Sequence, residues 1–276
     1  LSVRKQWGQN FLINPQVRTS LVDALDAETG QTVWEIGSGL GSMTALLLER
    51  KVKVMAFEID PGLCSVLEYL FGAMDNFTLI RGDVLKTWKT AESAPYLLGN
   101  LPYTVAALLM GNLITEQCFF KRMLIMVQKE VALRMTALPG SKNYSSISVL
   151  CASAYTMKII KTLKGSSFYP APHVDSAALC FERRHDAALP PALFYSLVRA
   201  LFTSRRKTIA NNLQNFLSRS CTIKEGRKTP SIISAGERAA AALNSCGLSG
   251  RERAETVPLE VFFALARSLE KNGYEH

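Results

Sequence analysis

The chain has no hydrophobic run long enough to cross a membrane, and it has few of the residues that build metal or disulfide sites. Its longest apolar runs, such as residues 45–48 and 105–110, are far shorter than the roughly 20 residues of a membrane span. The six cysteines include no CxxC pair, and neither His173 nor His185 has a partner at metal-ligand spacing. No apolar signal core follows the basic N-terminal residues. We therefore expect a cytoplasmic protein with no metal, disulfide framework or membrane anchor.

The basic excess of the chain is concentrated in its last third. The 276 residues carry a net charge of +9. Residues 1–182 hold 17 Lys and Arg against 15 Asp and Glu, whereas residues 183–276 hold 15 against 8. Such a local positive field favours a phosphate backbone as partner. The alternative is a mildly basic protein that binds no nucleic acid.

Strand-like and helical stretches alternate through the first half of the chain. The apolar strand-like runs are 32–36, 52–57, 77–80, 96–98 and 123–127. The helical stretches between and after them are 42–49, 63–71, 105–115 and 131–138. This alternation predicts an α/β fold with a parallel sheet and helices on both faces. Residues 156–163 and 176–182 are expected to close the sheet as an antiparallel edge hairpin.

Beyond residue 184 the chain shows helical periodicity only. The segment HDAALPP (185–191) is typical of a linker. We therefore predict two domains, an α/β domain over residues 1–185 and a small all-helical domain over residues 186–276. The helices expected in the second domain are 192–202, 206–217, 235–245 and 259–271.

A glycine-rich turn follows the first strand-like run. The stretch EIGSGLG (35–41) places Gly37 and Gly39 where a strand turns into a helix, so that a ligand can approach the backbone closely. A dinucleotide-binding turn usually has the spacing GxGxxG, whereas here it is GxGxG after an acidic residue. This variant favours a cationic nucleoside without phosphates, and S-adenosyl-L-methionine is such a ligand.

Two carboxylates follow the next two strand-like runs. Glu58 comes 21 residues after Gly37, where a carboxylate can accept hydrogen bonds from ribose hydroxyls, and Asp83 can meet the exocyclic amine of adenine. Each can equally be a helix cap, because acidic residues favour first turns. For Asp60 the cap is at least as good an interpretation as a place beside the ligand.

The fourth run ends in the tetrapeptide Asn100, Leu101, Pro102 and Tyr103, which contains no good general base or strong nucleophile. An amide oxygen and a backbone carbonyl can instead hold the hydrogens of an adenine N6 amine and direct its lone pair at a sulfonium methyl. Pro102 would fix the backbone, and Tyr103 and Phe168 would stack on an extruded base. The alternatives are a strand-to-helix turn capped by Asn100 and an ordinary core phenylalanine.

The ordered motifs make the chain resemble the ribosomal RNA adenine dimethyltransferase family, more closely its small-subunit branch. The matching stretches are GQNFL (8–12), EIGSGLG (35–41), EID (58–60), GDVL (82–85), GNLPY (99–103), QKEVALRM (128–135), YSSISVL (144–150), FYPAPHVDSA (168–177) and LFTSRRKT (201–208). The resemblance implies a Rossmann-like class I methyltransferase sheet, and it implies that Asn10 and Leu12 close over the cofactor. It also supports Gly37, Glu58, Asp83 and Asn100 as cofactor contacts.

The same resemblance implies a substrate and a partner. The substrate would be two adjacent adenosines in the 3′-terminal hairpin loop of small-subunit (16S) rRNA, each methylated twice at N6, within an immature 30S particle. Arg205, Arg206 and Lys207 would touch the rRNA backbone, unless they are only a solvated helix face. Nothing in the sequence demands a dimer, so we expect a monomer.

Three other functions remain open from the sequence. One is an Erm-type large-subunit rRNA adenine methyltransferase, which shares the fold and most of the motifs. The second is a non-catalytic ribosome assembly factor or transcription factor with the same fold. An NAD-dependent oxidoreductase is the third, and the glycine spacing disfavours it.

Overall fold

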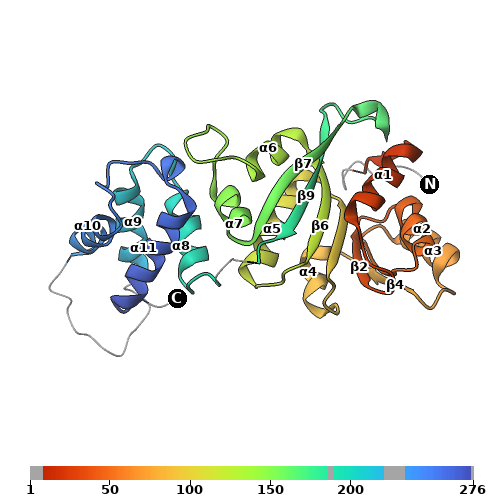
Figure 1. Cartoon of the computed structure of the whole chain (residues 1–276), viewed down its shortest axis with the longest axis horizontal. Helices are drawn as coiled ribbons and strands as arrows, with labels where there is room; N and C mark the ends of the chain where they lie inside the picture. Colours follow the sequence, from red (N-terminus) through yellow and green to blue (C-terminus); the bar gives the residue numbers. More distant parts are fainter. Residues whose placement is uncertain (1–8, 186–188, 221–233, 275–276) are drawn as a thin grey trace. The chain divides into compact units, whose positions relative to one another are not determined.

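The computed structural model describes residues 9–185, 189–220 and 234–274, which form two compact units (Figure 1). The first unit comprises residues 1–136 and 154–185, and the second comprises residues 137–153 and 186–276. The chain crosses from the first unit to the second between residues 185 and 186, at the predicted domain boundary. The assignment of residues 137–153 to the second unit was not expected from the sequence.

The first unit is built on a seven-stranded sheet with the order β4-β3-β2-β5-β6-β9-β7. β2 to β6 are parallel, while β9 is antiparallel to both β6 and β7, so the predicted parallel sheet and edge hairpin are confirmed. The strands are β2 (Thr32–Ile36), β3 (Lys53–Glu58), β4 (Phe77–Arg81), β5 (Tyr96–Asn100), β6 (Arg122–Gln128), β7 (Tyr155–Leu163) and β9 (Ser176–Arg183).

Helices connect the parallel strands and cover the sheet. The connections run outward from β2 to β4 and then return through β5 to β6, so right-handed crossovers place their helices on opposite faces. The helices of this unit are α1 (Pro15–Leu25), α2 (Ser42–Glu49), α3 (Pro61–Phe71), α4 (Val84–Thr87), α5 (Tyr103–Thr115) and α6 (Lys129–Met135). The change of direction between β2 and β5 leaves a crevice at their carboxyl ends.

The first helix begins at an Asn-Pro pair, which is a sequence signal for a helix start. The Asn14 side chain accepts a hydrogen bond from the Val17 backbone N–H at 3.0 Å, and Pro15 occupies the first helical turn. Leu21 and Leu25 are buried on the face that packs against the sheet. The segment that precedes α1 is thereby fixed close to the strands.

A short second sheet joins this N-terminal segment to a distant part of the chain. β1 (Phe11–Leu12) pairs antiparallel with β8 (Phe168–Tyr169), with Leu12 opposite Phe168. Both side chains are buried in one hydrophobic cluster with α1 and α2. This pairing was not expected from the sequence, because two-residue strands carry no periodic signal.

The second unit is helical in its described residues, as predicted. Its helices are α7 (Ser146–Ala154), α8 (Phe194–Leu201), α9 (Ile209–Ser220), α10 (Ala235–Ser245) and α11 (Leu259–Lys271). The last residue of α7 already belongs to the first unit. Phe194 and Phe263 stack with their ring centroids 4.5 Å apart and join α8 to α11. The Tyr144 ring packs against Phe202, which attaches the segment around residue 144 to α8. No helix in the described ranges is long and apolar enough to cross a membrane.

Candidate active site

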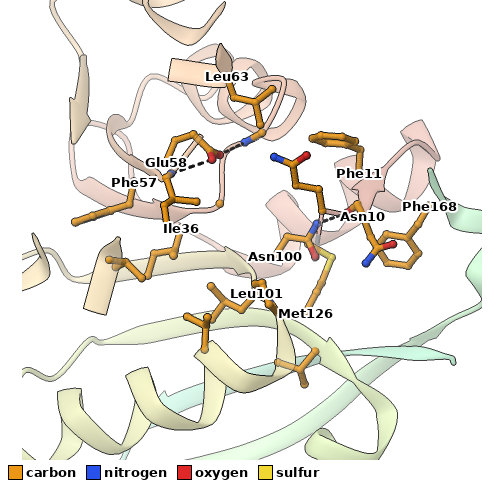
Figure 2. Close-up of a pocket in the computed structure, with 18 of the residues that line it drawn as sticks. Asn10, Phe11, Ile36, Phe57, Glu58, Leu63, Asn100, Leu101, Met126 and Phe168 are labelled. Carbon is orange, nitrogen blue, oxygen red and sulfur yellow. Dashed lines mark hydrogen bonds between the residues drawn. The ribbon is translucent and has the colours of Figure 1, made fainter. Parts of the chain in front are cut away.

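The carboxyl ends of β2 to β6 border a pocket of about 490 Å³, a volume that suits a ligand of nucleoside size (Figure 2). It lies within the first unit, where the strand order reverses. We call the side formed at the ends of β2, β3 and β4 the acidic wall, and it comprises Gly37, Gly39, Glu58 and Asp83. We call the side formed by β5, β6 and β8 the amide wall, and it comprises Asn100, Leu101, Gln128 and Phe168.

Two glycines let the turn after β2 lie against its neighbours. Gly37 has φ +76°, and a Cβ there would come within 2.9 Å of the Asn100 carbonyl oxygen. Gly39 has φ +58°, and a Cβ there would be 3.1 Å from the Phe11 ring. A side chain at Gly37 would therefore strain the backbone and push the two walls apart.

Glu58 is oriented by backbone amides. One of its carboxylate oxygens accepts from the N–H groups of Ile59 and Asp60, and the other accepts from Gly39, each at 2.9 Å. These bonds use three of the roughly four acceptor positions of a carboxylate. One position on the oxygen bonded to Gly39 remains for a ligand hydroxyl.

The structure gives Asp83 and Asp60 different surroundings. Asp83 caps α4 by accepting from the Leu85 N–H at 3.0 Å, and it also lines the pocket. Asp60 caps α3 through Gly62 and Leu63, as the cap interpretation predicted, and its other oxygen accepts from Gln9 at 3.0 Å. Asp83 is thus a helix cap that also lines the pocket, whereas Asp60 does not line it.

The Asn100 side chain turns into the pocket from the end of β5, as Figure 2 shows. Its Nδ2 donates a hydrogen bond to the Asn10 backbone carbonyl at 2.9 Å. In the described part of the chain nothing bonds to the other end of this amide. The bond to residue 10 consequently fixes which end of the amide faces the pocket as an acceptor.

The next two residues, Leu101 and Pro102, differ in what their backbone carbonyls bind. The Leu101 N–H donates to the Met126 carbonyl at 3.1 Å, while its own carbonyl accepts no hydrogen bond from a described residue. The Pro102 carbonyl accepts from the N–H groups of Val105 and Ala106, both at 3.0 Å. Pro102 therefore starts α5, and of these two carbonyls only that of Leu101 is available to a ligand. The Tyr103 side chain lies outside the described part of the structure.

In the N-terminal segment, Phe11 and not Leu12 lines the pocket beside Asn10. Leu12 does not line the pocket, since it is buried in the core beside Phe168. Asn10 and Phe11 line the pocket instead. Phe168 is buried at 4% exposure, as the core interpretation predicted, and it also lines the pocket.

A buried acid lies behind the glycine turn. Glu35 is 4% exposed, and one of its carboxylate oxygens accepts from the Thr44 hydroxyl at 2.6 Å. Burial raises the pKa of the Glu35 carboxyl to about 7, although the hydrogen bonds from Thr44 and Ser38 act in the opposite direction. A group that changes charge near neutral pH thus lies next to the pocket without lining it.

The comparisons with known proteins agree with this geometry. The chain matches the family "Ribosomal RNA adenine dimethylase" over residues 1–228. It belongs to this family. The family is one of methyltransferases, and the resemblance stated from the motifs is therefore confirmed.

Curated relatives of this family match nearly the whole chain. The "Ribosomal RNA small subunit methyltransferase A" of Treponema pallidum (strain Nichols) is 42% identical over 274 residues, which cover 98% of this chain and 92% of the relative. The protein of the same name from Streptococcus pneumoniae (strain P1031) is 34% identical, with coverages of 98% and 93%.

Two solved structures of rRNA methyltransferases or dimethyladenosine transferases have the same fold as this chain. A dimethyladenosine transferase from Plasmodium falciparum superimposes with a TM-score of 0.81 at 25% identity, covering 96% of this chain and 98% of that one. The 23S rRNA methyltransferase ErmE gives a TM-score of 0.65 at 23% identity, covering 95% and 100% of the two chains. The Rossmann-like methyltransferase fold predicted from the sequence is thus confirmed.

The basic residues of the second unit are not equivalent. Arg205 Nη2 donates to the Lys142 carbonyl at 2.7 Å and forms an ion pair with Glu255 at 3.1 Å. Arg206 and Lys207 are exposed, and their side chains have no partner among the residues that the structure describes. Arg205 therefore stabilises its own unit, while its two neighbours are available to a partner.

Phe11 and Gln128 line the pocket but were given no role from the sequence. Both belong to motifs that carried the family resemblance, GQNFL and QKEVALRM. Strand alternation would have pointed to Gln128, because it is a polar residue two positions beyond a buried Met126 at the end of a strand.

Proposed function

We propose that the chain transfers methyl groups from S-adenosyl-L-methionine to N6 of two adjacent adenosines in the 3′-terminal hairpin loop of small-subunit (16S) rRNA, giving N6,N6-dimethyladenosine. The observation that carries this proposal is the orientation of Asn100, whose Nδ2 is bonded to residue 10 while its oxygen remains for an amine. The relatives named for the small ribosomal subunit support the choice of RNA.

The acidic wall suits S-adenosyl-L-methionine. Gly37 and Gly39 present backbone rather than side chains to the pocket, so the turn can lie against a nucleoside. Glu58 has one acceptor position left for a ribose hydroxyl, and one oxygen of Asp83 remains for the adenine amine. Both carboxylates also favour a positively charged ligand over a phosphorylated one.

The amide wall suits the amine of a target adenine. The Asn100 side-chain oxygen and the Leu101 carbonyl would accept the two N6 hydrogens, which draws the nitrogen lone pair out of the ring. The cofactor, held by the acidic wall, would supply an electrophilic methyl group, so that N6 would gain a nitrogen–carbon bond as the carbon–sulfur bond breaks. The same two acceptors stabilise the positive charge that develops on N6 until its proton passes to solvent.

The remaining parts of the proposal concern context. Residues 1–185 would be the methyltransferase domain, and residues 186–276 the RNA-binding domain, with Arg206 and Lys207 contacting phosphates. The partner would be rRNA within an immature 30S particle in the cytoplasm, and the enzyme would act as a monomer. The exposed pair of cations in the second unit supports this division of labour.

The test measures methyl incorporation into defined ribosomal substrates. The purified chain and labelled S-adenosyl-L-methionine are incubated with immature small subunits and with naked 23S rRNA, and nucleosides are identified by mass spectrometry. We expect N6,N6-dimethyladenosine only in the small-subunit hairpin. Activity confined to 23S rRNA would establish the Erm-type alternative, and cofactor binding without incorporation in any substrate would establish a non-catalytic factor.

A further inference from the structure

The amide wall contains a second carboxamide, Gln128, to which the proposed chemistry assigns no role. Gln128 is the last residue of β6, and its side chain is half-buried where it lines the pocket. Asn100 ends the neighbouring strand β5. Two carboxamide residues at the ends of adjacent strands therefore line the pocket.

The Gln128 side chain makes no hydrogen bond to any residue that the structure describes. Gln128 occupies the position before α6, but its side chain makes no hydrogen bond to cap that helix. Ser, Thr, Asp and Asn are the residues that cap helices in this way, so glutamine is a poor choice for the position on structural grounds. Within residues 9–185, 189–220 and 234–274 its amide has no partner, which leaves two donors and one acceptor for a ligand.

Strand register places this amide next to the reacting position. β5 and β6 are parallel with Asn100 opposite Met126, and Gln128 lies two residues further along on the same face. The spacing and rise of parallel strands put the Cα atoms of Asn100 and Gln128 about 8 Å apart. A flat base whose amine meets Asn100 would thus extend along the wall toward Gln128.

We propose that the Gln128 amide N–H donates a hydrogen bond to a ring nitrogen beside the exocyclic amine of the target base, and that Gln128 is a specificity-determining residue. This inference rests on the proposed function. Adenine has acceptors at N1 and N7 on the two sides of its N6 amine, and neither is consumed when N6 is methylated. The bond uses no N6 hydrogen, whereas the bonds to Asn100 and Leu101 lose one N6 hydrogen in each methyl transfer.

Guanine would not fit the same arrangement. It carries a carbonyl oxygen where adenine has the N6 amine, so whichever ring nitrogen faces Gln128, that oxygen would meet the acceptors of Asn100 and Leu101. At N1 guanine also carries a hydrogen, so the Gln128 amide would have to rotate and present its oxygen instead of its N–H. Unpaired buried polar groups are a strong basis for rejecting a wrong ligand.

The experiment compares wild-type chain and Gln128→Met on small-subunit particles whose hairpin carries adenosine, 1-deazaadenosine or 7-deazaadenosine at the target. Methionine keeps the length of the side chain and removes its donors. We expect Gln128→Met to reduce kcat/KM about tenfold on adenosine, the size of one hydrogen bond. On the analogue that lacks the bonded nitrogen the two proteins should be equally active, and on the other analogue the tenfold difference should remain.

The matched control is Gln31→Met, because Gln31 is exposed and lies just before β2, at the amino-terminal end of the strand and away from the pocket at the carboxyl ends. It should match the wild-type chain on all three substrates. An equal loss for Gln128→Met on all three substrates, or no loss on adenosine, overturns the inference. If the wild-type chain leaves the unmodified hairpin unmethylated, the proposed function fails, and the inference fails with it.

Discussion

The two walls of the pocket are held in place by different kinds of contact. In the acidic wall, Glu58 bonds to Gly39, 19 residues away, and Asp83 bonds to a residue two positions on. In the amide wall, Asn100 bonds to residue 10, 90 positions away, and Phe168 pairs with Leu12. The binding side of the pocket is therefore determined largely by local turns, whereas the reacting side depends on the N-terminal segment being in place.

The largest expected effect is that of Asn100→Ala, which removes the side-chain acceptor of the amide wall together with its bond to the Asn10 carbonyl. Losing one preorganised partner of the developing charge should lower kcat by about 10² to 10³. The dissociation constants for S-adenosyl-L-methionine and RNA should change far less. Asn211→Ala, which removes an exposed amide of α9, is the control. Single-turnover kinetics measure the rate of methyl transfer, and calorimetry measures the dissociation constants. Equal losses in binding and in turnover would show that the amide wall does not act mainly on the reaction step.

The acid behind the glycine turn should make stability depend on pH. The Glu35 carboxyl has an unfolded pKa near 4.5 and a folded pKa of about 7, so the folded state retains the proton longer. The free energy of unfolding should therefore fall by about 3 kcal/mol as the pH rises through this interval, and then level off.

Glu35→Gln keeps an acceptor for Thr44 and removes the titration. The difference in unfolding free energy between this variant and the wild-type chain should change between pH 4.5 and 7 and be constant above pH 7, as measured by denaturant titration. A wild-type chain that gains stability relative to Glu35→Gln over the same interval would contradict the proposed cause.

The contrast between the walls also explains what the sequence could reveal. The strand at residues 32–36 and the helix at 42–49 are observed with the predicted bounds, because both have clear periodicity and flank a glycine turn. The Asp60 cap was readable for the same local reason. In contrast, the β1–β8 pairing and the replacement of Leu12 by Phe11 in the pocket depend on contacts across more than 150 residues. Two helices were missed: α4 has only four residues, and α7 begins directly after Ser145, whose value as a cap residue was not used.

Gly37→Ala should affect both walls at once, because Gly37 is where they touch. The methyl group would come within 2.9 Å of the Asn100 carbonyl, and the φ of +76° adds strain of about 1 to 2 kcal/mol. Cofactor affinity and kcat should therefore both fall. Gly30→Ala is a matched control, since Gly30 has φ +80° and no atom lies within 4 Å of the position that its Cβ would take. If both variants behave alike, backbone strain and not the contact between the walls explains the loss.

The smallest effects are expected in the second unit, where the same contrast exists between a side chain held by the fold and side chains free for a partner. Replacing Arg206 and Lys207 together with alanine should weaken RNA binding by about tenfold at moderate salt and reduce the slope of log K against log salt by roughly 1.4 to 1.8. Arg205→Ala should instead lower the free energy of unfolding by about 1 kcal/mol, because it removes the hydrogen bond to the Lys142 carbonyl and the ion pair with Glu255. Filter binding across a salt series and thermal unfolding separate the two outcomes; a larger loss of salt dependence from Arg205→Ala than from the double variant would mean that Arg205 leaves its internal partners to bind RNA.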